Sequence, residues 1–547
     1  MTMKGGDISR RRTKLLLEGF ASATKVLAKI SGNNVKTGFV ALMILVAFFR
    51  AWIGRFSMDP DGVGYLDVAD RYVHQDWSHA INAYWSPLYS WLLAAGMLLL
   101  RPGGRTEFAF AHAINCGIFL GTLGCFEYFW RSLRREVFDS ARQSEDTQGN
   151  NPLPELALWS LAHAVFLWST LDLITIHVVG ADLCTAAFVY LIGGLLLRIR
   201  RSPTWPQLLS LGAALGFSYF AKAVMFPLGF CFIAIGFFSL RDRRGAIPRM
   251  VVVTLVFLVL TAPFILAISR EKGRLTFGDA GKLAYSEYVS PGVTSVRNWQ
   301  GTPPGSGTPM HPTRKISDHP PAFEFATPVA GTYPPYYDAS YWNEGRVASF
   351  DIEAQLVRLK VDFLICAELF FHSQSGLLAG ALILLLLGGS MSVPALLRNW
   401  PLFAMCFAGM GIYMLVSVEP RYVAAYVTVF WVTLLASIRL PQRPDVIRAA
   451  RYVSMAAFVT VCLSVVDTTA RAVRDGGPYS VYNDIVIAES LHNLGLRERD
   501  RVATVGDLSY WAKAGGLKVV AEVMSSDAPE FWRTPEEGRQ RLYESFA

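Results

Sequence analysis

The chain has 547 residues, of which 52% are hydrophobic and only 17% are charged, and its mean hydropathy is +0.32. Soluble proteins carry about 25% charged residues, so this composition excludes an ordinary soluble enzyme and indicates a protein that crosses a membrane several times. The formal net charge of +8 does not indicate nucleic-acid binding, because most clustered basic residues flank apolar segments. The seven cysteines form no CxxC pattern, so neither a disulfide framework nor a zinc site is expected.

Eleven apolar segments approach the ~20 residues that cross a bilayer. They cover residues 37–53, 107–130, 155–177, 183–198, 206–220, 224–240, 250–268, 377–393, 402–418, 422–438 and 450–466. The further apolar stretch 86–100 is short for a crossing and suits a helix that lies flat in the interface. If it lies flat, the basic loop 131–142 and the other basic clusters all fall on one side, which the positive-inside rule identifies as cytoplasmic. We therefore predict an all-α polytopic membrane protein with eleven transmembrane helices, its N-terminus inside and its C-terminus outside.

This topology divides the chain into three parts. They are a basic cytoplasmic N-terminus (1–36), a transmembrane module (37–466) and an extracytoplasmic tail (467–547). Within the module, the loops 54–106 and 270–375 lie on the outer side. Loops as long as the second one are usually lids or binding loops.

The second outer loop and the tail contain recognisable elements. Apolar residues recur at helical spacing over residues 350–372, which predicts an amphipathic helix on the membrane face. In the tail, the strand-like segments 501–506 and 517–523 flank a short helical stretch. We predict a small α/β unit there, in which no third strand is recognisable.

The most informative residues are Asp59 and Asp61, which stand just past the outer end of the first apolar segment. Carboxylates at a membrane boundary are costly unless they are solvated or used. Simple solvation explains either residue alone, whereas the pair, followed by Gly62, Gly64 and Tyr65, favours a function for Asp61. An aspartate in this position suits a general base that acts on an acceptor hydroxyl.

The outer ends of later segments carry isolated polar residues, whereas the inner ends carry Arg and Lys clusters. The outer residues are His177, Asp182, Lys222, Glu419 and Arg421. Lys222 and Arg421 suit a phosphate group, Arg421 through its planar fork. Simpler alternatives stay open, because Lys222 is also explained as a snorkelling cation and Glu419 with Arg421 as an ion pair between two helix ends. Asp182 beside His177 resembles a pair of metal ligands only weakly.

Taken in chain order, these motifs resemble the GT-C superfamily of integral-membrane glycosyltransferases, which use polyprenyl-phosphate sugars. Within that superfamily, the likeness is to the bacterial aminoarabinose transferases of lipid A and to the protein O-mannosyltransferases. The resemblance covers roughly residues 37–440. It leaves the tail and the Pro- and Tyr-rich part of the second outer loop unexplained.

The resemblance implies roles for individual residues. Asp61 and Tyr65 match the catalytic Asp of the first outer loop and the Tyr that follows it. The segment Trp85-Ser86-Pro87-Leu88-Tyr89 matches in part a motif that opens a juxtamembrane helix. Tyr219-Phe220-Ala221-Lys222 resembles a Leu-Thr-Lys-Gly turn, and Asp182 resembles an outer Asp between early spans.

Arg421-Tyr422 resembles a late Arg-Tyr motif of the same superfamily, but two positions depart from its pattern. Ser86 stands where a phosphate-contacting Lys is frequent, and Gly62 stands where an acidic residue often follows the catalytic Asp. The paired acids here are Asp59 and Asp61, which leaves open which of them is the base.

The resemblance implies an inverting glycosyltransferase of a bacterial-type cytoplasmic membrane, with its active site facing the periplasm or exterior. The expected partners are a polyprenyl-phosphate-sugar donor, an acceptor that is a lipid, glycan or protein, and membrane lipids. Asp61 or Asp59 would be the catalytic base. The residues expected to bind substrate are Tyr65, Trp85, Tyr89, Asp182, Lys222, Glu419, Arg421 and Tyr422.

No cofactor is expected, because the sequence has no convincing Walker or dinucleotide fingerprint; a divalent cation stays open, although it has no strong ligand set. The aromatic residues of the outer loops are explained most simply as an interfacial belt, and otherwise as platforms for sugar rings. The alternative function is a secondary transporter or lipid flippase. Transporters hold charges near the bilayer midplane and often contain internal repeats, and the sequence displays neither clearly.

Overall fold

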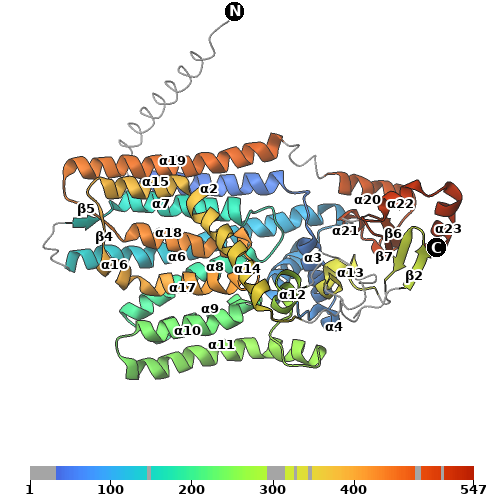
Figure 1. Cartoon of the computed structure of the whole chain (residues 1–547), viewed down its shortest axis with the longest axis horizontal. Helices are drawn as coiled ribbons and strands as arrows, with labels where there is room; N and C mark the ends of the chain where they lie inside the picture. Colours follow the sequence, from blue (N-terminus) through green and yellow to red (C-terminus); the bar gives the residue numbers. More distant parts are fainter. Residues whose placement is uncertain are drawn as a thin grey trace, which may run out of the picture.

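The computed structural model describes residues 32–143, 150–291, 314–325, 329–342, 348–474, 482–506 and 510–546. The basic N-terminus up to residue 31 and the Pro-rich segment 302–309 lie outside the described residues. Figure 1 shows long helices packed side by side as a bundle, with short helices and a sheet gathered beyond one end.

Each of the eleven predicted segments contains a helix, although several of these helices end before the predicted segment does. The bundle helices are α2 (Gly32–Ile53), α6 (Gly104–Gln143), α7 (Glu155–Trp168), α8 (Asp182–Arg201), α9 (Trp205–Ala221), α10 (Met225–Ser239), α11 (Arg243–Glu271), α15 (Ser375–Leu386), α17 (Trp400–Met414), α18 (Pro420–Ala436) and α19 (Pro444–Arg474). Within the described residues, six helices are long and apolar enough to cross a membrane, and the pair Ile352–His372 and Ser375–Leu386, bent by 60°, would make a seventh. The expected helical membrane-protein fold is confirmed, whereas the number of spans stays a prediction.

The basic segment 131–142 is not the loop that the sequence suggested. It continues helix α6 beyond its apolar part, up to Gln143. No Gly or Pro interrupts the chain between Cys125 and Gln143, so nothing in the sequence ends the helix where its hydrophobicity ends.

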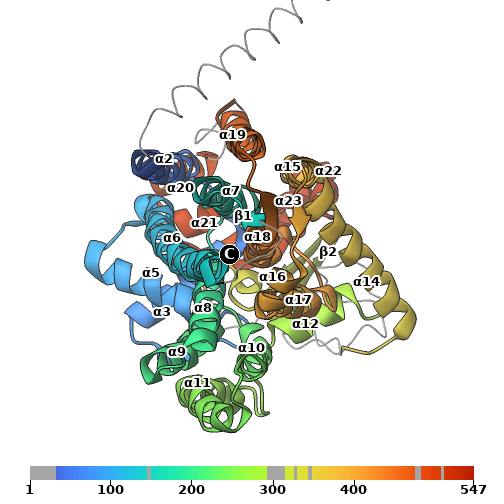
Figure 2. The same cartoon turned by 90° about the vertical axis from the view of Figure 1, so that its left-hand side faces the viewer.

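Short helices at one end of the bundle carry the first outer loop. They are α3 (Pro60–Val73), α4 (Trp77–Ala80) and α5 (Pro87–Leu100). Figure 2 looks along the bundle, so most long helices are seen end-on, whereas α5 lies across them. The last residues of α5, Leu98 to Leu100, are strongly exposed. A helix that lies across the bundle and exposes leucines has the placement expected for the interface.

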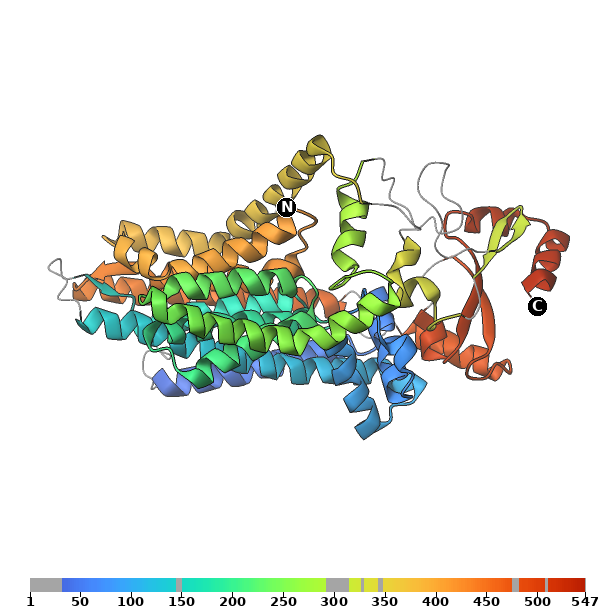
Figure 3. The same cartoon turned by 90° about the horizontal axis from the view of Figure 1, so that it is seen from below.

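A four-stranded sheet joins the tail to the second outer loop, beyond the same end of the bundle (Figure 3). Its order is β2 (Arg314–Asp318), β3 (Pro321–Glu324), β7 (Lys518–Val523) and β6 (Arg501–Val505). Strands β6 and β7 are parallel, with α21 (Tyr510–Ala514) between them in sequence, and β3 pairs antiparallel with β7. The expected α/β unit is present, and the strands that the tail itself lacks come from the second outer loop.

Smaller elements complete both ends. At the end that carries α3 these are α12 (Ala280–Tyr288), α13 (Pro334–Tyr337), η2 (Ala339–Trp342), α20 (Asn483–Asn493), α22 (Ala528–Arg533) and α23 (Glu536–Phe546). From there α14 (Ile352–Ala367) and η3 (Glu368–His372) lead back along the bundle, where Phe370 packs on Phe430 of α18. At the other end lie α16 (Val393–Arg398) and a three-stranded sheet of β1 (Asn150–Pro152), β5 (Ile438–Pro441) and β4 (Ser390–Met391).

The main core fills the space between the central helices. Phe126 of α6 stacks on Phe166 of α7 with 4.5 Å between ring centroids, and Tyr190 of α8 lies against both rings. All three side chains are fully buried. Gly194 lets α8 approach α6, because a Cβ there would come within 2.7 Å of the Tyr128 ring. Such close packing fixes the helix ends that carry the candidate site.

Candidate active site

Asp59 caps helix α3. Its side chain accepts a hydrogen bond of 2.8 Å from the backbone N–H of Gly62, and Pro60 takes the first helical position. An acidic N-cap followed by Pro is a strong helix start. The other carboxylate oxygen accepts the N–H of Val179 at 3.0 Å. Both oxygens of Asp59 are therefore held by backbone groups, and Asp61 is the carboxylate that contacts cationic side chains.

Asp61 belongs to a cluster of four charged side chains from four helices. Its Oδ2 atom is 3.3 Å from Nη2 of Arg421, which lies in the first turn of α18. The Nη1 atom of Arg421 is 3.6 Å from Oδ2 of Asp182, the first residue of α8. The Nζ atom of Lys222, the residue that ends α9, donates a 2.6 Å hydrogen bond to Oδ1 of Asp182. One chain of ion pairs thus joins residues that are far apart in the sequence.

Three helices begin at this charged cluster. Asp61, Asp182 and Arg421 each lie in the first turn of their helix, in α3, α8 and α18 respectively. Helix N-termini carry partial positive charge and attract anions. The helix dipole opposes a cation such as Arg421 in this position, so negative partners must hold it there. The same arrangement suits an external anion such as a phosphate.

Two tyrosines form a wall beside the cations. The Nζ atom of Lys222 lies 3.4 Å from the ring centroid of Tyr422 and 6.0 Å from that of Tyr413. The two rings stack with 5.3 Å between their centroids. Aromatic faces attract cations, so this pair helps to hold the ammonium group at the cluster. Tyr413 was missed in the sequence because it lies in the uniformly apolar helix α17.

Three aromatic residues that were expected to bind substrate pack together beside α3. The ring centroid of Tyr65 lies 4.7 Å from that of Trp85 and 5.0 Å from that of Tyr89. Trp85 donates a hydrogen bond to the carbonyl of Tyr336 at 3.2 Å, and the Tyr89 hydroxyl donates to Asn115 at 2.7 Å. All three side chains are buried. These contacts hold α3, α5 and α13 together.

Glu419 and His177 lie apart from the cluster. Glu419 is the N-cap residue of α18, and its side chain is exposed. In the described part of the chain, the ion pairs of Arg421 run to Asp61 and Asp182 instead. His177 is exposed as well, and no group of three His, Cys, Asp or Glu side chains within the described residues is arranged to hold a metal ion.

The environment changes the acidity of both aspartates that open α3. Burial, together with the neighbouring Asp61 carboxylate, raises the pKa of Asp59 to about 7. Burial also raises the pKa of Asp61, against the opposing effect of the Arg421 guanidinium. A carboxylate with a raised pKa is a better proton acceptor, which suits Asp61 for general-base chemistry.

A buried ion-pair cluster, which was not predicted from the sequence, ties α3 to the tail. The Nζ atom of Lys513, in α21, lies 3.1 Å from Asp67 and 3.2 Å from Glu107. Asp67 also accepts hydrogen bonds of 2.7 and 2.9 Å from the N–H and hydroxyl of Thr332. The only sequence signal was an isolated Lys in an apolar stretch. Through these contacts the tail and the second outer loop hold the helix that carries Asp61.

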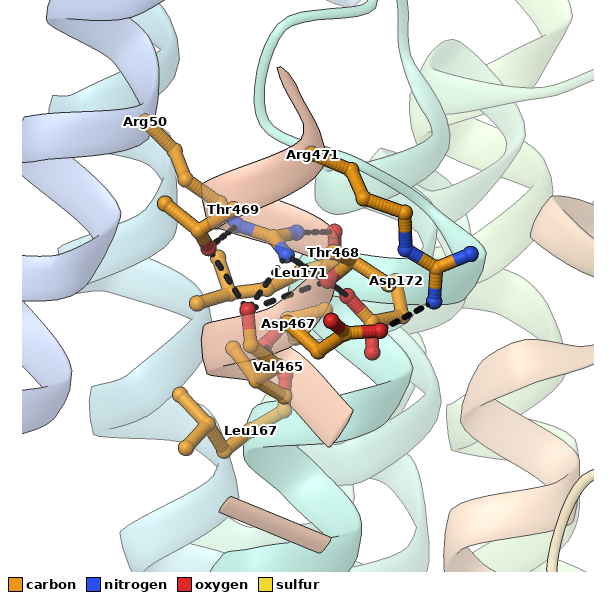
Figure 4. A network of polar contacts seen from close by, with 10 residues as sticks. Arg50, Leu167, Leu171, Asp172, Val465, Asp467, Thr468, Thr469 and Arg471 are labelled. Carbon is orange, nitrogen blue, oxygen red and sulfur yellow. Dashed lines mark hydrogen bonds and ion pairs between the residues drawn. The ribbon is translucent and has the colours of Figure 1, made fainter. Parts of the chain in front are cut away.

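Figure 4 shows a second network inside the bundle, around Arg50 near the outer end of α2. Its guanidinium donates hydrogen bonds to Asp172 at 2.8 Å, to Thr469 at 2.6 Å and to the Val465 carbonyl at 2.9 Å. Asp172 lies in the π turn η1 (Ser169–Leu173), which leads into the loop that binds Asp59. This network could not be predicted from the sequence, because its members lie on three separate apolar segments.

No protein-family model and no curated protein sequence matches the chain. Solved structures similar to it include ArnT from Cupriavidus metallidurans bound to undecaprenyl phosphate, with a TM-score of 0.48 and 13% sequence identity, covering 88% of this chain and 85% of that chain. The apo state of the same protein matches with a TM-score of 0.45 and 12% identity over the same shares of both chains.

Proposed function

We propose that the chain is an inverting glycosyltransferase that moves a sugar from a polyprenyl-phosphate-sugar donor to an acceptor hydroxyl on the outer face of the cytoplasmic membrane. The observation that carries this proposal is the charged cluster, in which Asp61 lies 3.3 Å from Arg421, and Asp182 links Arg421 to Lys222. A proton acceptor beside phosphate-binding cations is the pair of groups that such a transfer needs. The order of motifs that resembles the GT-C superfamily supports the same function.

In the proposed reaction, Asp61 accepts the proton of the acceptor hydroxyl while that oxygen forms a bond to the anomeric carbon of the sugar. The bond between the anomeric carbon and the phosphate oxygen breaks on the opposite side, and its electron pair leaves with the polyprenyl phosphate. Negative charge on that phosphate grows in the transition state. Arg421 and Lys222 would stabilise it, while Asp182 keeps both cations in place.

Donor binding would also prepare the base. Without a donor, the Arg421 guanidinium pairs with Asp61 and favours its ionised form. A donor phosphate that takes over Arg421 removes this stabilisation, so Asp61 becomes more basic when the acceptor arrives. This exchange would order the two substrates, with the donor binding before the proton transfer.

The position of the charges supports an enzyme over a transporter. Asp182 begins α8, Lys222 ends α9 and Arg421 lies in the first turn of α18. All three residues therefore stand at the outer ends of predicted spans, whereas transporters place their substrate sites near the bilayer midplane.

The test is lipid mass spectrometry on cells that carry the wild-type chain, a deletion, Asp61→Asn or Asp70→Asn. Asp70 is the matched control, because it lies on the same helix with its side chain 52% exposed. We expect the deletion and Asp61→Asn to accumulate one polyprenyl-phosphate sugar and to lose one glycan modification, and Asp70→Asn to behave like wild type. With purified protein, Asp61→Asn should lower kcat by about 10²- to 10⁴-fold.

Two outcomes would change the assignment. If Asp61→Asn behaves like wild type while the deletion has an effect, Asp61 is not the base, and Asp59→Asn is the next variant to test. If the deletion blocks passage of a lipid across the membrane and purified protein transfers no sugar, the transporter or flippase interpretation replaces the enzyme.

A further inference from the structure

A basic cavity lies between α2, α6 and α7, at the end of the bundle opposite the candidate active site. Its volume is about 640 Å³, within the usual range for a small-molecule site of about 300 to 1,000 Å³. Its charged lining residues are Lys36, Arg131, Arg134, Arg135, Glu127 and Glu155. None of them belongs to the charged cluster around Asp61.

The cavity has an excess of positive charge. Glu155 is shared by two cations, with Lys36 at 3.0 Å and Arg134 at 2.8 Å. Glu127 lies 2.8 Å from the buried His163 ring, and Arg131 reaches it only at 3.8 Å. Four basic side chains thus face two carboxylates, an excess of two positive charges.

Arg131 and Arg135 are the cations best placed to receive an external anion. The Arg131 side chain is 69% exposed, and Arg135 is exposed as well. Among the described residues, Arg135 forms no ion pair and Arg131 only the long one to Glu127. Four residues apart on α6, the two side chains share one face of that helix. Two guanidinium groups on one face suit a phosphate group.

The inner wall of the cavity is apolar. Trp130 and Trp159 line it and are almost fully buried, and Val40 of α2 completes the wall. Elsewhere along its length α2 exposes large apolar side chains, Leu42 and Leu45 among them. A basic mouth beside an apolar helix face matches a molecule that has an anionic head and hydrocarbon tails.

We propose that this cavity binds the headgroup of an anionic glycerophospholipid, with the phosphate at Arg131 and Arg135 and the acyl chains along the exposed face of α2. The charge excess favours an anionic headgroup, because a zwitterionic one would bring a cation of its own to an already positive site. The exposed apolar face of α2 favours a lipid over a free phosphate ion. By the positive-inside rule, the lipid would belong to the cytoplasmic leaflet.

The test is native mass spectrometry of the full chain in detergent with phosphatidylglycerol or phosphatidylcholine of the same acyl chains. The variant is Arg131→Gln with Arg135→Gln. The matched control is Arg448→Gln with Arg451→Gln, which removes the same charge from exposed residues of α19 at the same end of the bundle but outside the cavity. We expect phosphatidylglycerol to bind the wild type in preference, the cavity variant to bind it about 30-fold more weakly, and the control to bind it like wild type.

Three results would overturn the proposal. They are equal binding of the two lipids by wild type, equal loss in the two double variants, and displacement of phosphatidylglycerol by inorganic phosphate at similar concentration. A fourth result, obtained by adding undecaprenyl phosphate to the same measurement, would also overturn it: if the wild type prefers that lipid and the cavity variant does not bind it, the cavity belongs to the donor lipid. The lipid preference and its weakening by salt are measured on the wild type, so the test does not depend on the variant folding.

Discussion

Arg50 and Arg421 are two arginines near the outer end of the bundle that are used in different ways. Arg50 donates through all three of its guanidinium nitrogens, to Asp172, Thr468, Thr469 and two backbone carbonyls, and its side chain is only 8% exposed. Arg421 is 26% exposed and makes two long hydrogen bonds, to Asp61 at 3.3 Å and to the Tyr422 hydroxyl at 3.4 Å.

The difference separates a structural cation from one that is free to bind a ligand. A guanidinium presents its N–H donors on three nitrogens, and each of the three nitrogens of Arg50 donates to the protein. Arg421 keeps donors that bond to nothing within the described residues, at a place where helix N-termini converge. Arg50 is the more deeply buried of the two side chains, and its guanidinium donates to more acceptors than that of Arg421 does.

The largest expected effect is on stability, in the Arg50 network. Arg50→Leu leaves the buried Asp172 carboxylate without its counter-ion and should lower the free energy of unfolding by about 3 to 5 kcal/mol. Chemical denaturation in detergent measures this change in the free energy of unfolding. Arg50→Leu combined with Asp172→Leu should recover most of this loss. Arg71→Leu, which breaks the half-exposed pair with Asp76, is the control and should cost at most about 1 kcal/mol. A stable Arg50→Leu single variant would contradict the structural role.

Arg421→Gln should show the opposite pattern, with a large effect on activity and a small one on stability. Removing a cation that stabilises the developing phosphate charge should lower kcat by about 10²- to 10³-fold. The ion pairs of Arg421 are long, at 3.3 and 3.6 Å, and should contribute only about 1 kcal/mol to folding. Sugar-transfer kinetics and denaturation on the same preparation measure both. Arg105→Gln, at an exposed position of the same end, should retain full activity. If Arg421→Gln unfolds the protein, Arg421 has a structural role like that of Arg50, and the prediction is wrong.

Asp59→Ala should have a moderate effect. It removes the N-cap of α3 and the acceptor for the Val179 N–H, so we expect a loss of about 1 to 2 kcal/mol in the free energy of unfolding. Asp59→Asn should lose less, because Asn also caps helices. Denaturation of the two variants side by side measures the difference. If Asp59→Asn abolishes transfer in a folded protein, Asp59 takes part in the chemistry and does not only cap α3.

The smallest effect concerns pH. A base must be ionised, so kcat/KM falls as the pH drops through the pKa of Asp61, which burial raises above its ordinary value of 3.8. The acidic limb of the pH profile should therefore lie above pH 3.8. The Asp182 carboxylate contributes to this rise, so Asp182→Asn removes a negative charge, favours ionisation of Asp61 and should move the limb to lower pH. A profile that shifts upward, or stays in place, would mean that the two carboxylates do not interact as described.

The bundle and the choice of candidate residues could be predicted from the sequence, because they depend on properties that are local along the chain. The length of each apolar segment predicted its helix, and the distribution of Arg and Lys gave the side of each loop. These two properties, segment length and the distribution of basic residues, predicted that Asp61, Asp182, Lys222 and Arg421 lie on one side of the membrane. The predicted end of α6 was wrong, because the helix continues beyond the residue at which its apolar stretch ends.

Which side chains meet was decided only by the tertiary structure. The sequence favoured Asp61 but left open whether it or Asp59 is the base, and the structure separates them, because the N–H of Val179 occupies one oxygen of Asp59. The Lys513 contacts with Asp67 and the Arg50 contacts with Asp172 likewise join elements from distant parts of the chain. Such pairs form because packing brings particular helix ends together, and packing between distant elements leaves no periodic pattern along a single sequence.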